Sequence, residues 1–360
     1  MKKKILLIIG TRPEFIKLFP LYKKLANNKN FITKVCFTGQ HKQLISQHNS
    51  IFKIKSNFNL KIMTKNQNLF SINQKLFKNF ANLFENEPFD AVCVQGDTNS
   101  AMIGALSAFY KKMKIIHVEA GLKTFDKYNP FPEEVNRDII SCIADLNFAP
   151  TINAKKNLLQ KNIDKNKVFL VGNTVIDTLK FILKKNNINI QTNKQIICTM
   201  HRNENKGKNL EIFCNSIINL SKKFREWKIL ISSHPRPDIQ KILKKKFNKK
   251  NKNIVIKKSM KYEEFIEELS KSSLVITDSG GVQEEAAYLG KFTFILRKVT
   301  ERVEILEKKL GKKIKIKESE IQNKIGRFIL SNKWKRSKRS YVFGKGFASN
   351  KIMKILNTKL

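Results

Sequence analysis

Short runs of apolar residues alternate with segments of helical periodicity from one end of the chain to the other. Continuous apolar runs are typical of strands buried on both faces, and amphipathic helices between such strands are typical of βαβ units. This pattern predicts the α/β class with parallel sheets. In the first half we expect helices such as 15–25 and 101–110, and strands at 4–9, 34–38, 90–95, 114–118 and 146–149.

A second series of the same kind follows a break in the pattern. After an expected strand at 168–171 and helix at 175–183, residues 184–194 are rich in Lys and Asn without an apolar period, which predicts a linker. Further strands are expected at 196–200, 228–232, 253–256, 274–277 and 292–296. We therefore expect two Rossmann-like domains, 1–183 and 195–340, joined by the linker 184–194, with 341–360 forming a helix that packs back on the first domain.

Composition narrows the class of protein. A hydrophobic fraction of 41% and a charged fraction of 28% are those of a globular chain. The five cysteines are widely spaced without a Cys-x-x-Cys pair, so neither a disulfide framework nor a metal site is expected. The apolar run at 5–9 is too short for a signal peptide, and no run approaches the ~20 residues of a membrane span. We expect a cytoplasmic protein with no membrane insertion.

The net charge of +42 raises the question of a nucleic-acid partner. Lys is spread along the whole chain together with Asn, Ile and Phe, and there is no aromatic-basic stripe or recognition module. The charge is therefore interpreted as a compositional bias, and no nucleic acid is expected as a partner. A basic RNA- or DNA-binding protein stays an alternative.

Polar motifs follow the expected strands of the first half, where parallel sheets bind ligands. Gly10-Thr11-Arg12-Pro13-Glu14 opens a helix and brings Arg12 and Lys17 to its N-terminal end, where they could neutralise an anion. The alternative is an ordinary strand–helix connector. Asp97 and Glu119 follow two later strands, and Glu133 follows a Pro-x-Pro turn. Each acid alone could be a helix cap, but three so close in sequence indicate acid–base chemistry.

The second half carries motifs suited to a nucleotide. His201 follows its first strand and could act as an acid or base, and His234 follows the next strand. Ser279-Gly280-Gly281 joins a strand to a helix, so that backbone N–H groups face a phosphate or diphosphate. Glu285 would repel phosphates and suits a ribose diol instead. Arg302 suits the diphosphate, or else a surface helix cap.

Taken in order, these segments resemble the non-hydrolysing UDP-N-acetylglucosamine 2-epimerase family of the GT-B superfamily. The resemblance runs from Gly10-Thr11-Arg12-Pro13-Glu14 to Gly344-Lys345-Gly346. It implies a GT-B fold with the active site in the cleft between two Rossmann-like domains, a UDP-sugar substrate, no metal or other cofactor, and a homodimer. The implied reaction converts UDP-GlcNAc to UDP-ManNAc by anti elimination of UDP through 2-acetamidoglucal and re-addition, and supplies sugars for cell-surface polysaccharide.

The resemblance also implies roles for particular residues. The residues that match the family's acid–base set are Asp97, Glu119, Glu133 and His201, and which carboxylate performs which step stays open. The residues that match its UDP site are Arg12, Lys17, Phe265 (uracil), Ser279, Gly280, Gly281 and Arg302 (diphosphate) and Glu285 (ribose). A second, activating UDP-sugar site in bacterial relatives matches Gln40, His41, Gln43, Arg202 and His234. Departures from the family pattern occur at Lys123, Asn203, Val303 and Asn66.

Three other enzymes share part of this pattern. A hydrolysing 2-epimerase would release UDP and a free sugar, but that branch departs from the family at the Gly10 to Glu14 motif. A 2-epimerase of a modified UDP-acetamido sugar would differ in the pocket around 125–131. A GT-B glycosyltransferase would share the UDP site but would need an acceptor cleft in place of three clustered acids.

Overall fold

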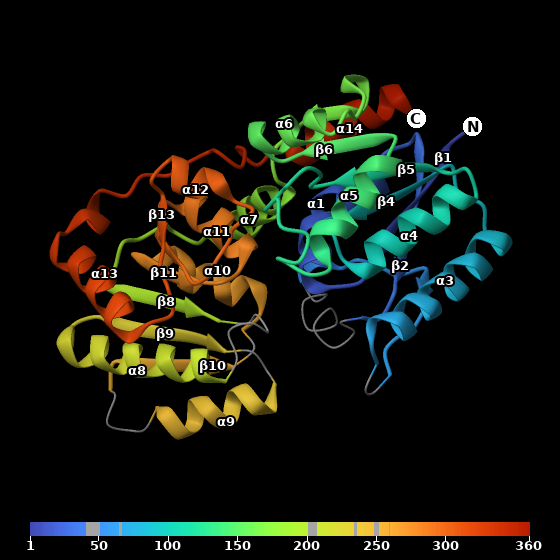
Figure 1. Cartoon of the computed structure of the whole chain (residues 1–360). Helices are drawn as coiled ribbons and strands as arrows, with labels where there is room; N and C mark the ends of the chain where they lie inside the picture. Colours follow the sequence, from blue (N-terminus) through green and yellow to red (C-terminus); the bar gives the residue numbers. More distant parts are fainter. Residues whose placement is uncertain (41–50, 65–66, 201–206, 234–235, 248–251, 259) are drawn as a thin grey trace. The chain divides into compact units, whose positions relative to one another are not determined.

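The computed structural model describes residues 1–40, 51–64, 67–200, 207–233, 236–247, 252–258 and 260–360. It divides into two compact α/β units (Figure 1). The first unit contains Met1–Thr178 and Phe343–Leu360, and the second contains Leu179–Val342. The residues expected to form a linker, 184–194, lie within the second unit, where Gln191 and Asn193 donate backbone hydrogen bonds to the carbonyls of Ser270 and Lys271 at 3.0 Å each.

The first unit is built on a seven-stranded sheet in the order β3-β2-β1-β4-β5-β6-β7, in which every pair is parallel. Its strands are β1 (Lys3–Ile9), β2 (Phe31–Phe37), β3 (Phe58–Asn59), β4 (Ala91–Gln95), β5 (Lys114–Val118), β6 (Leu146–Ala149) and β7 (Val168–Leu170). Its helices are α1 (Arg12–Ala26), α3 (Leu69–Asn86), α4 (Asn99–Tyr110), α5 (Glu133–Ile143), α6 (Ile152–Gln160), η1 (Lys165–Lys167) and α14 (Ala348–Lys359), while α7 (Thr174–Lys185) crosses into the second unit.

Helices cover both faces of this sheet, which explains why its central strands carry continuous apolar runs. Leu6 and Ile8 of β1 belong to a core cluster with α3, α4 and α5. Side chains alternate along a strand, so Leu7 faces the opposite side, where α1 packs. The C-terminal helix α14, red in Figure 1, lies among the blue and green elements of this unit and packs against α1.

The second unit contains a six-stranded parallel sheet in the order β10-β9-β8-β11-β12-β13. Its strands are β8 (Gln195–Thr199), β9 (Lys228–Ser233), β10 (Ile254–Lys258), β11 (Leu274–Thr277), β12 (Phe292–Ile295) and β13 (Gly311–Lys313). Its helices are α8 (Lys208–Lys223), α9 (Pro237–Lys246), α10 (Tyr262–Lys271), α11 (Gly280–Leu289), α12 (Val303–Glu307), α13 (Glu318–Leu330) and η3 (Lys333–Arg336). Trp227 and Trp334 meet edge to face in its core, with ring centroids 4.9 Å apart.

Both sheets reverse their strand order once, between β1 and β4 and between β8 and β11. In open parallel sheets the crevice at such a reversal, beyond the carboxyl ends of the strands, is where ligands bind. Of the motifs singled out in the sequence, those with Arg12, Asp97, His201 and Ser279 follow β1, β4, β8 and β11 in the chain, the strands on the two sides of these reversals. Among the described residues, no helix is long and apolar enough to cross a membrane.

Candidate active site

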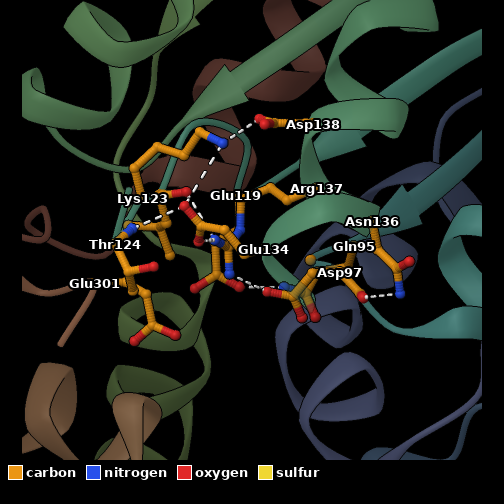
Figure 2. A network of polar contacts seen from close by, with 12 residues as sticks. Gln95, Asp97, Glu119, Lys123, Thr124, Glu134, Asn136, Arg137, Asp138 and Glu301 are labelled. Carbon is orange, nitrogen blue, oxygen red and sulfur yellow. Dashed lines mark hydrogen bonds and ion pairs between the residues drawn. The ribbon is translucent and has the colours of Figure 1, made fainter. Parts of the chain in front are cut away.

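In the first unit, two of the expected acid–base residues follow adjacent strands on one side of the reversal point. Asp97 follows β4, and Glu119 follows β5, which pairs with β4. Glu119 has a positive φ of 66°, an uncommon and costly conformation for a residue with a side chain. Figure 2 shows both acids within one network of polar contacts.

The Glu119 carboxylate is surrounded by hydrogen-bond donors. Lys17 on α1 lies 2.6 Å from both of its oxygens, Asn173 donates to Oε1 at 2.9 Å, and Gln95 at the end of β4 donates to Oε2. Glu119 and Lys17 are both buried. A buried ion pair needs such additional hydrogen bonds to offset the loss of hydration. Strand ends and the first turns of α1 therefore hold Glu119 in one position.

Asp97 is held from the side of α5. The buried Arg137 forms an ion pair with the Asp97 carboxylate and donates to the Leu122 carbonyl at 2.8 Å. Asn136, one residue earlier on the same helix, donates to the Asp97 carbonyl at 3.0 Å. One turn of α5 thus fixes both the side chain and the backbone of Asp97.

Glu134 connects this turn to the segment that follows β5. Its Oε2 accepts from Arg137 at 2.9 Å, and its Oε1 accepts the backbone N–H groups of Thr124 and Phe125 at 3.0 and 3.1 Å (Figure 2). Lys123 lies 3.6 Å from Glu134 and also pairs with Asp138. A continuous row of alternating charges therefore runs from Asp97 to the aromatic segment 125–131.

Glu133, the third expected acid, is the first residue of α5, and Pro132 precedes it as N-cap. It is half-buried. Its place next to Glu134 in sequence puts it on the helix that also carries Arg137. The structure therefore brings Glu133 and Asp97 to the same end of α5, because Arg137 and Asn136 bind Asp97 from the first turns of this helix.

His117 is a buried histidine that the sequence did not single out. Its Nε2 lies 2.8 Å from the Gly96 carbonyl, which can only accept, so Nε2 carries the proton and Nδ1 accepts from the Ser141 hydroxyl at 3.1 Å. Burial lowers the pKa of His117 to about 4. The neutral ring therefore serves to hold Gly96, the residue before Asp97.

In the second unit, the segment after β11 enters α11 as expected. Ser279 is the N-cap of α11, and Gly280 and Gly281 are its first two residues. The first N–H groups of a helix have no acceptor within the helix and suit an anion. The Arg302 side chain lies against Gly280, because a Cβ atom there would be 2.6 Å from its Cζ. The structure thus brings together the four residues expected at a diphosphate.

Arg302 is itself ion-paired, since its Nε donates to Glu284 at 2.8 Å and its Nη1 to Glu301 at 3.3 Å. Arg297 binds the same Glu301 at 2.6 Å. These pairs orient the guanidinium beside the N-terminus of α11. Glu284 and Glu301 were not anticipated, because nothing in their spacing distinguishes them from helix caps.

The two remaining residues of the expected UDP site in the second unit lie on α11 and α10. Glu285 is buried and accepts from the Tyr262 hydroxyl at 2.7 Å. Phe265, on the same helix as Tyr262, is half-buried. In the first unit, Arg12 is the first residue of α1, and Gln40 accepts from the Ser100 hydroxyl at 3.0 Å. His41, Gln43, His201, Arg202 and His234 lie outside the described residues.

Sequence reasoning missed the residues that position the acids: Gln95, Glu134, Arg137 and Asn173. Only one of their contacts had a signal in the sequence. Glu134 and Arg137 are three residues apart on one helix, a spacing that places opposite charges side by side. Gln95 and Asn173 meet Glu119 only through the fold. Among the described residues, no group of three or more His, Cys, Asp or Glu side chains could hold a metal ion.

Two α/β units, each with a parallel sheet and a polar loop cluster at its reversal point, place the chain in the class of proteins with two Rossmann-like domains. Within this class the chain belongs to the UDP-N-acetylglucosamine 2-epimerase family, whose model matches residues 23–357. Its activity is that of an epimerase.

Named relatives and solved structures agree with this assignment. UDP-N-acetylglucosamine 2-epimerase of Campylobacter jejuni is 38% identical over 375 residues, covering 99% of this chain and 98% of the relative. The Bacillus subtilis enzyme of the same name is 36% identical, covering 99% and 96%. The Neisseria meningitidis UDP-GlcNAc 2-epimerase bound to UDP-GlcNAc has a TM-score of 0.92 at 33% identity, covering 99% and 100%. The Methanocaldococcus jannaschii enzyme in complex with UDP-GlcNAc and UDP has a TM-score of 0.85 at 32% identity, covering 99% of each chain.

Proposed function

We propose that this protein interconverts UDP-GlcNAc and UDP-ManNAc without releasing UDP to solution. The observation that carries this proposal is the pair of carboxylates at the ends of neighbouring strands, each held by its own buried cation: Asp97 by Arg137 and Glu119 by Lys17. Such fixed acids suit the transfer of a proton to and from carbon. The solved structures with UDP-GlcNAc bound support the choice of substrate.

In the proposed reaction a base removes the proton at C2 of the sugar. The electrons of that C–H bond form the C1–C2 double bond as the C1–O bond breaks, and UDP leaves with the bonding pair. The intermediate is 2-acetamidoglucal. An acid then protonates C2 from the opposite face while UDP adds back at C1. Asp97, Glu119, Glu133 and His201 are the groups proposed to perform the proton transfers.

Binding of UDP is proposed to use residues of both units. Ser279, Gly280 and Gly281 would bind the diphosphate with backbone N–H groups, and Arg302 with its guanidinium. Glu285 would accept from the ribose hydroxyls, and Phe265 would pack on the uracil. Cations near the diphosphate lower the cost of the negative charge that develops as UDP departs.

Arg12 and Lys17 are proposed to complete the UDP site from the start of α1. Lys17 is already paired with Glu119. It would therefore connect the charge of the leaving group with one of the acids. This connection offers a route by which departure of UDP and proton transfer stay coupled.

We also propose a second ligand site, an assembly and a cellular role. A second UDP-sugar would bind at Gln40, His41, Gln43, Arg202 and His234 and activate the enzyme. The protein would act as a homodimer in the cytoplasm, without a cofactor, and supply sugars for cell-surface polysaccharide.

The test is incubation of the protein with UDP-GlcNAc in heavy water. We expect UDP-ManNAc with deuterium at C2, detected by NMR, while free UDP stays far below the amount of sugar converted. Free UDP that accumulates in step with turnover would instead identify a hydrolysing 2-epimerase. Absence of exchange at C2 would contradict the proposal and favour a glycosyltransferase.

A further inference from the structure

Glu14 is a buried acid that the proposed chemistry does not use. It lies in the first turn of α1 and is 1% exposed. Its Oε2 accepts the backbone N–H of Gly10 at 2.9 Å and that of Thr11, the N-cap of the helix. These contacts belong to a capping box, a common way of starting a helix. By themselves they explain only the local structure.

A third contact reaches a different loop. The Thr98 hydroxyl donates to Oε1 of Glu14 at 2.6 Å, across 84 positions of sequence. Thr98 follows Asp97 directly and is the N-cap of α4, where its hydroxyl accepts the N–H of Ala101 at 3.1 Å. One carboxylate therefore connects the loop after β1 with the loop after β4, on the two sides of the reversal point.

The two loops are packed without spare room at this junction. A Cβ atom on Gly10 would lie 2.4 Å from the Ser100 hydroxyl and 3.0 Å from that of Thr38, and these two hydroxyls are 2.9 Å apart. The start of α1 therefore rests against the first turn of α4. A displacement of either loop has to be accommodated by the other.

A capping box alone does not require this arrangement. Glutamine can serve at the same position of a capping box, so the cap could be made without an ionisable group. Burying an ionisable acid costs free energy. Burial raises the pKa of Glu14 to about 7, even though hydrogen bonds from Thr98 and Thr11 act in the opposite direction. The chain therefore carries a costly group at a place where the loops of Arg12 and Asp97 meet.

We propose that Glu14 is a positioning residue for the epimerase reaction. Through Thr98 and the backbone amides of Gly10 and Thr11, it keeps Asp97 at a fixed position relative to Arg12 and Lys17. The proposal rests on the function proposed above. A misplacement of about 1 Å in such a group can reduce turnover by ~100-fold. The competing explanation is that Glu14 only caps α1.

The test compares Glu14→Ala, Glu14→Gln, Thr98→Val and Thr98→Ser by steady-state kinetics with UDP-GlcNAc. In Glu14→Gln the new side-chain amide can donate to the Thr98 hydroxyl while its oxygen accepts from the backbone, so we expect this variant and Thr98→Ser to keep most of kcat.

Glu14→Ala and Thr98→Val should each lower kcat about 10- to 100-fold, with KM changed less than about threefold. The double variant Glu14→Ala/Thr98→Val should be no worse than the poorer single variant. Effects on kcat that multiply, or an unchanged kcat with only a lower Tm, would overturn the proposal.

A second measurement does not depend on catalysis. Hydrogen exchange of peptides covering 96–101 should be faster in Glu14→Ala than in the wild type and unchanged in Glu14→Gln, with a peptide from α13 as control. Unchanged exchange at 96–101 in Glu14→Ala would contradict the link whatever the activity. If the wild type fails to exchange deuterium at C2 while this link is present, the proposed function fails and the structural connection stands.

Discussion

Asp97 and Glu119 each sit beside a buried cation, so a neutral replacement of the same shape removes the charge with little change in packing. We expect Asp97→Asn and Glu119→Gln each to lower turnover by ~100-fold or more, because each variant loses a group proposed to transfer a proton. UDP affinity, measured by calorimetry, should be nearly unchanged. Full activity in both variants would show that these acids are not the ones that transfer protons.

The contact between Gly280 and Arg302 allows the proposed diphosphate site to be tested with two adjacent glycines. An added Cβ on Gly280 would lie 2.6 Å from Cζ of Arg302, whereas one on Gly281 would meet nothing within 4 Å. Gly280→Ala should displace the guanidinium and weaken UDP binding by about tenfold, the order of one charge-assisted hydrogen bond. Gly281→Ala is the matched control and should weaken it distinctly less. Equal effects would argue against a role for Arg302.

The burial of His117 predicts how stability depends on pH. Its pKa is about 4 in the folded protein, below its ordinary 6.5. The unfolded chain therefore binds the proton more tightly, so the contribution of His117 is complete above pH 6.5 and is lost progressively as pH falls from 6.5 to 4. Denaturant titrations from pH 7 to 4 should show a loss of roughly 3 kcal/mol in the wild type beyond that in His117→Gln. Parallel curves for the two proteins would contradict this expectation.

How far the site could be predicted depended on whether its residues had local signals. The acids and the Ser-Gly-Gly turn follow strands, and strand ends can be found from apolar runs. The partners of Glu119 could not be found in this way, because they are far from it in sequence. Lys17 precedes Glu119 by 102 positions, and Asn173 follows it by 54. The Glu134 contacts to the amides of 124 and 125 depend on a loop conformation that no pattern indicates.

At the scale of elements, the α/β class and every expected strand are confirmed. Their ends differ by up to three residues, as at β2, expected at 34–38 and found at Phe31–Phe37. Two strands were missed, β3 and β13. The two residues of β3 are too few to show a pattern. β13 is Gly-Lys-Lys at the edge of its sheet, where hydrogen bonds to one neighbouring strand are enough to form a strand without apolar side chains. Apolar content therefore identifies the edge strands β7 and β10 as well as the central ones, but not a strand of two residues or one made of Gly and Lys.

Gly121 lies in the loop after β5 and allows a test of how much the close approach of helix α6 to this loop contributes to stability. Its φ is 85°, and a Cβ atom there would lie 2.2 Å from the Ala154 carbonyl on α6. We expect Gly121→Ala to lower the free energy of unfolding by more than ~2 kcal/mol, through strain and displacement of α6. Gly207→Ala is the control: its φ is also positive, at 61°, but nothing lies within 4 Å of the added atom, so only about 1 kcal/mol should be lost. Equal losses would mean that the contact with α6 is unimportant.

At the scale of the whole molecule, the chain leaves the first unit at Thr178 and returns to it at Phe343. The return is fixed by Asp177 on α7, whose carboxylate accepts the backbone N–H groups of Ala348 and Ser349 at 3.1 and 2.8 Å and the Ser349 hydroxyl at 2.6 Å. A carboxylate at a helix N-terminus both caps it and complements its dipole. Asp177 thus acts as the cap of α14 from a distant part of the sequence.

Replacement of this acid should loosen the C-terminal helix. We expect Asp177→Ala to cost about 1–2 kcal/mol and to raise hydrogen exchange and protease cleavage in 343–360. Asp164→Ala removes a cap of the short helix η1 at the surface and is the control, with no effect on that segment. Unaltered protection of 343–360 in Asp177→Ala would show that packing against α1 alone retains α14.

The return of the chain to its first unit has a consequence for biosynthesis. When the ribosome has made Met1–Thr178, the helix that covers α1 does not yet exist, and at ~5–20 residues per second it follows roughly 10 to 35 s later. The nascent first unit therefore waits with the apolar side of α1 uncovered, a surface suited to a chaperone. A message truncated before its last codons would leave that surface open permanently, and we expect its product to be degraded.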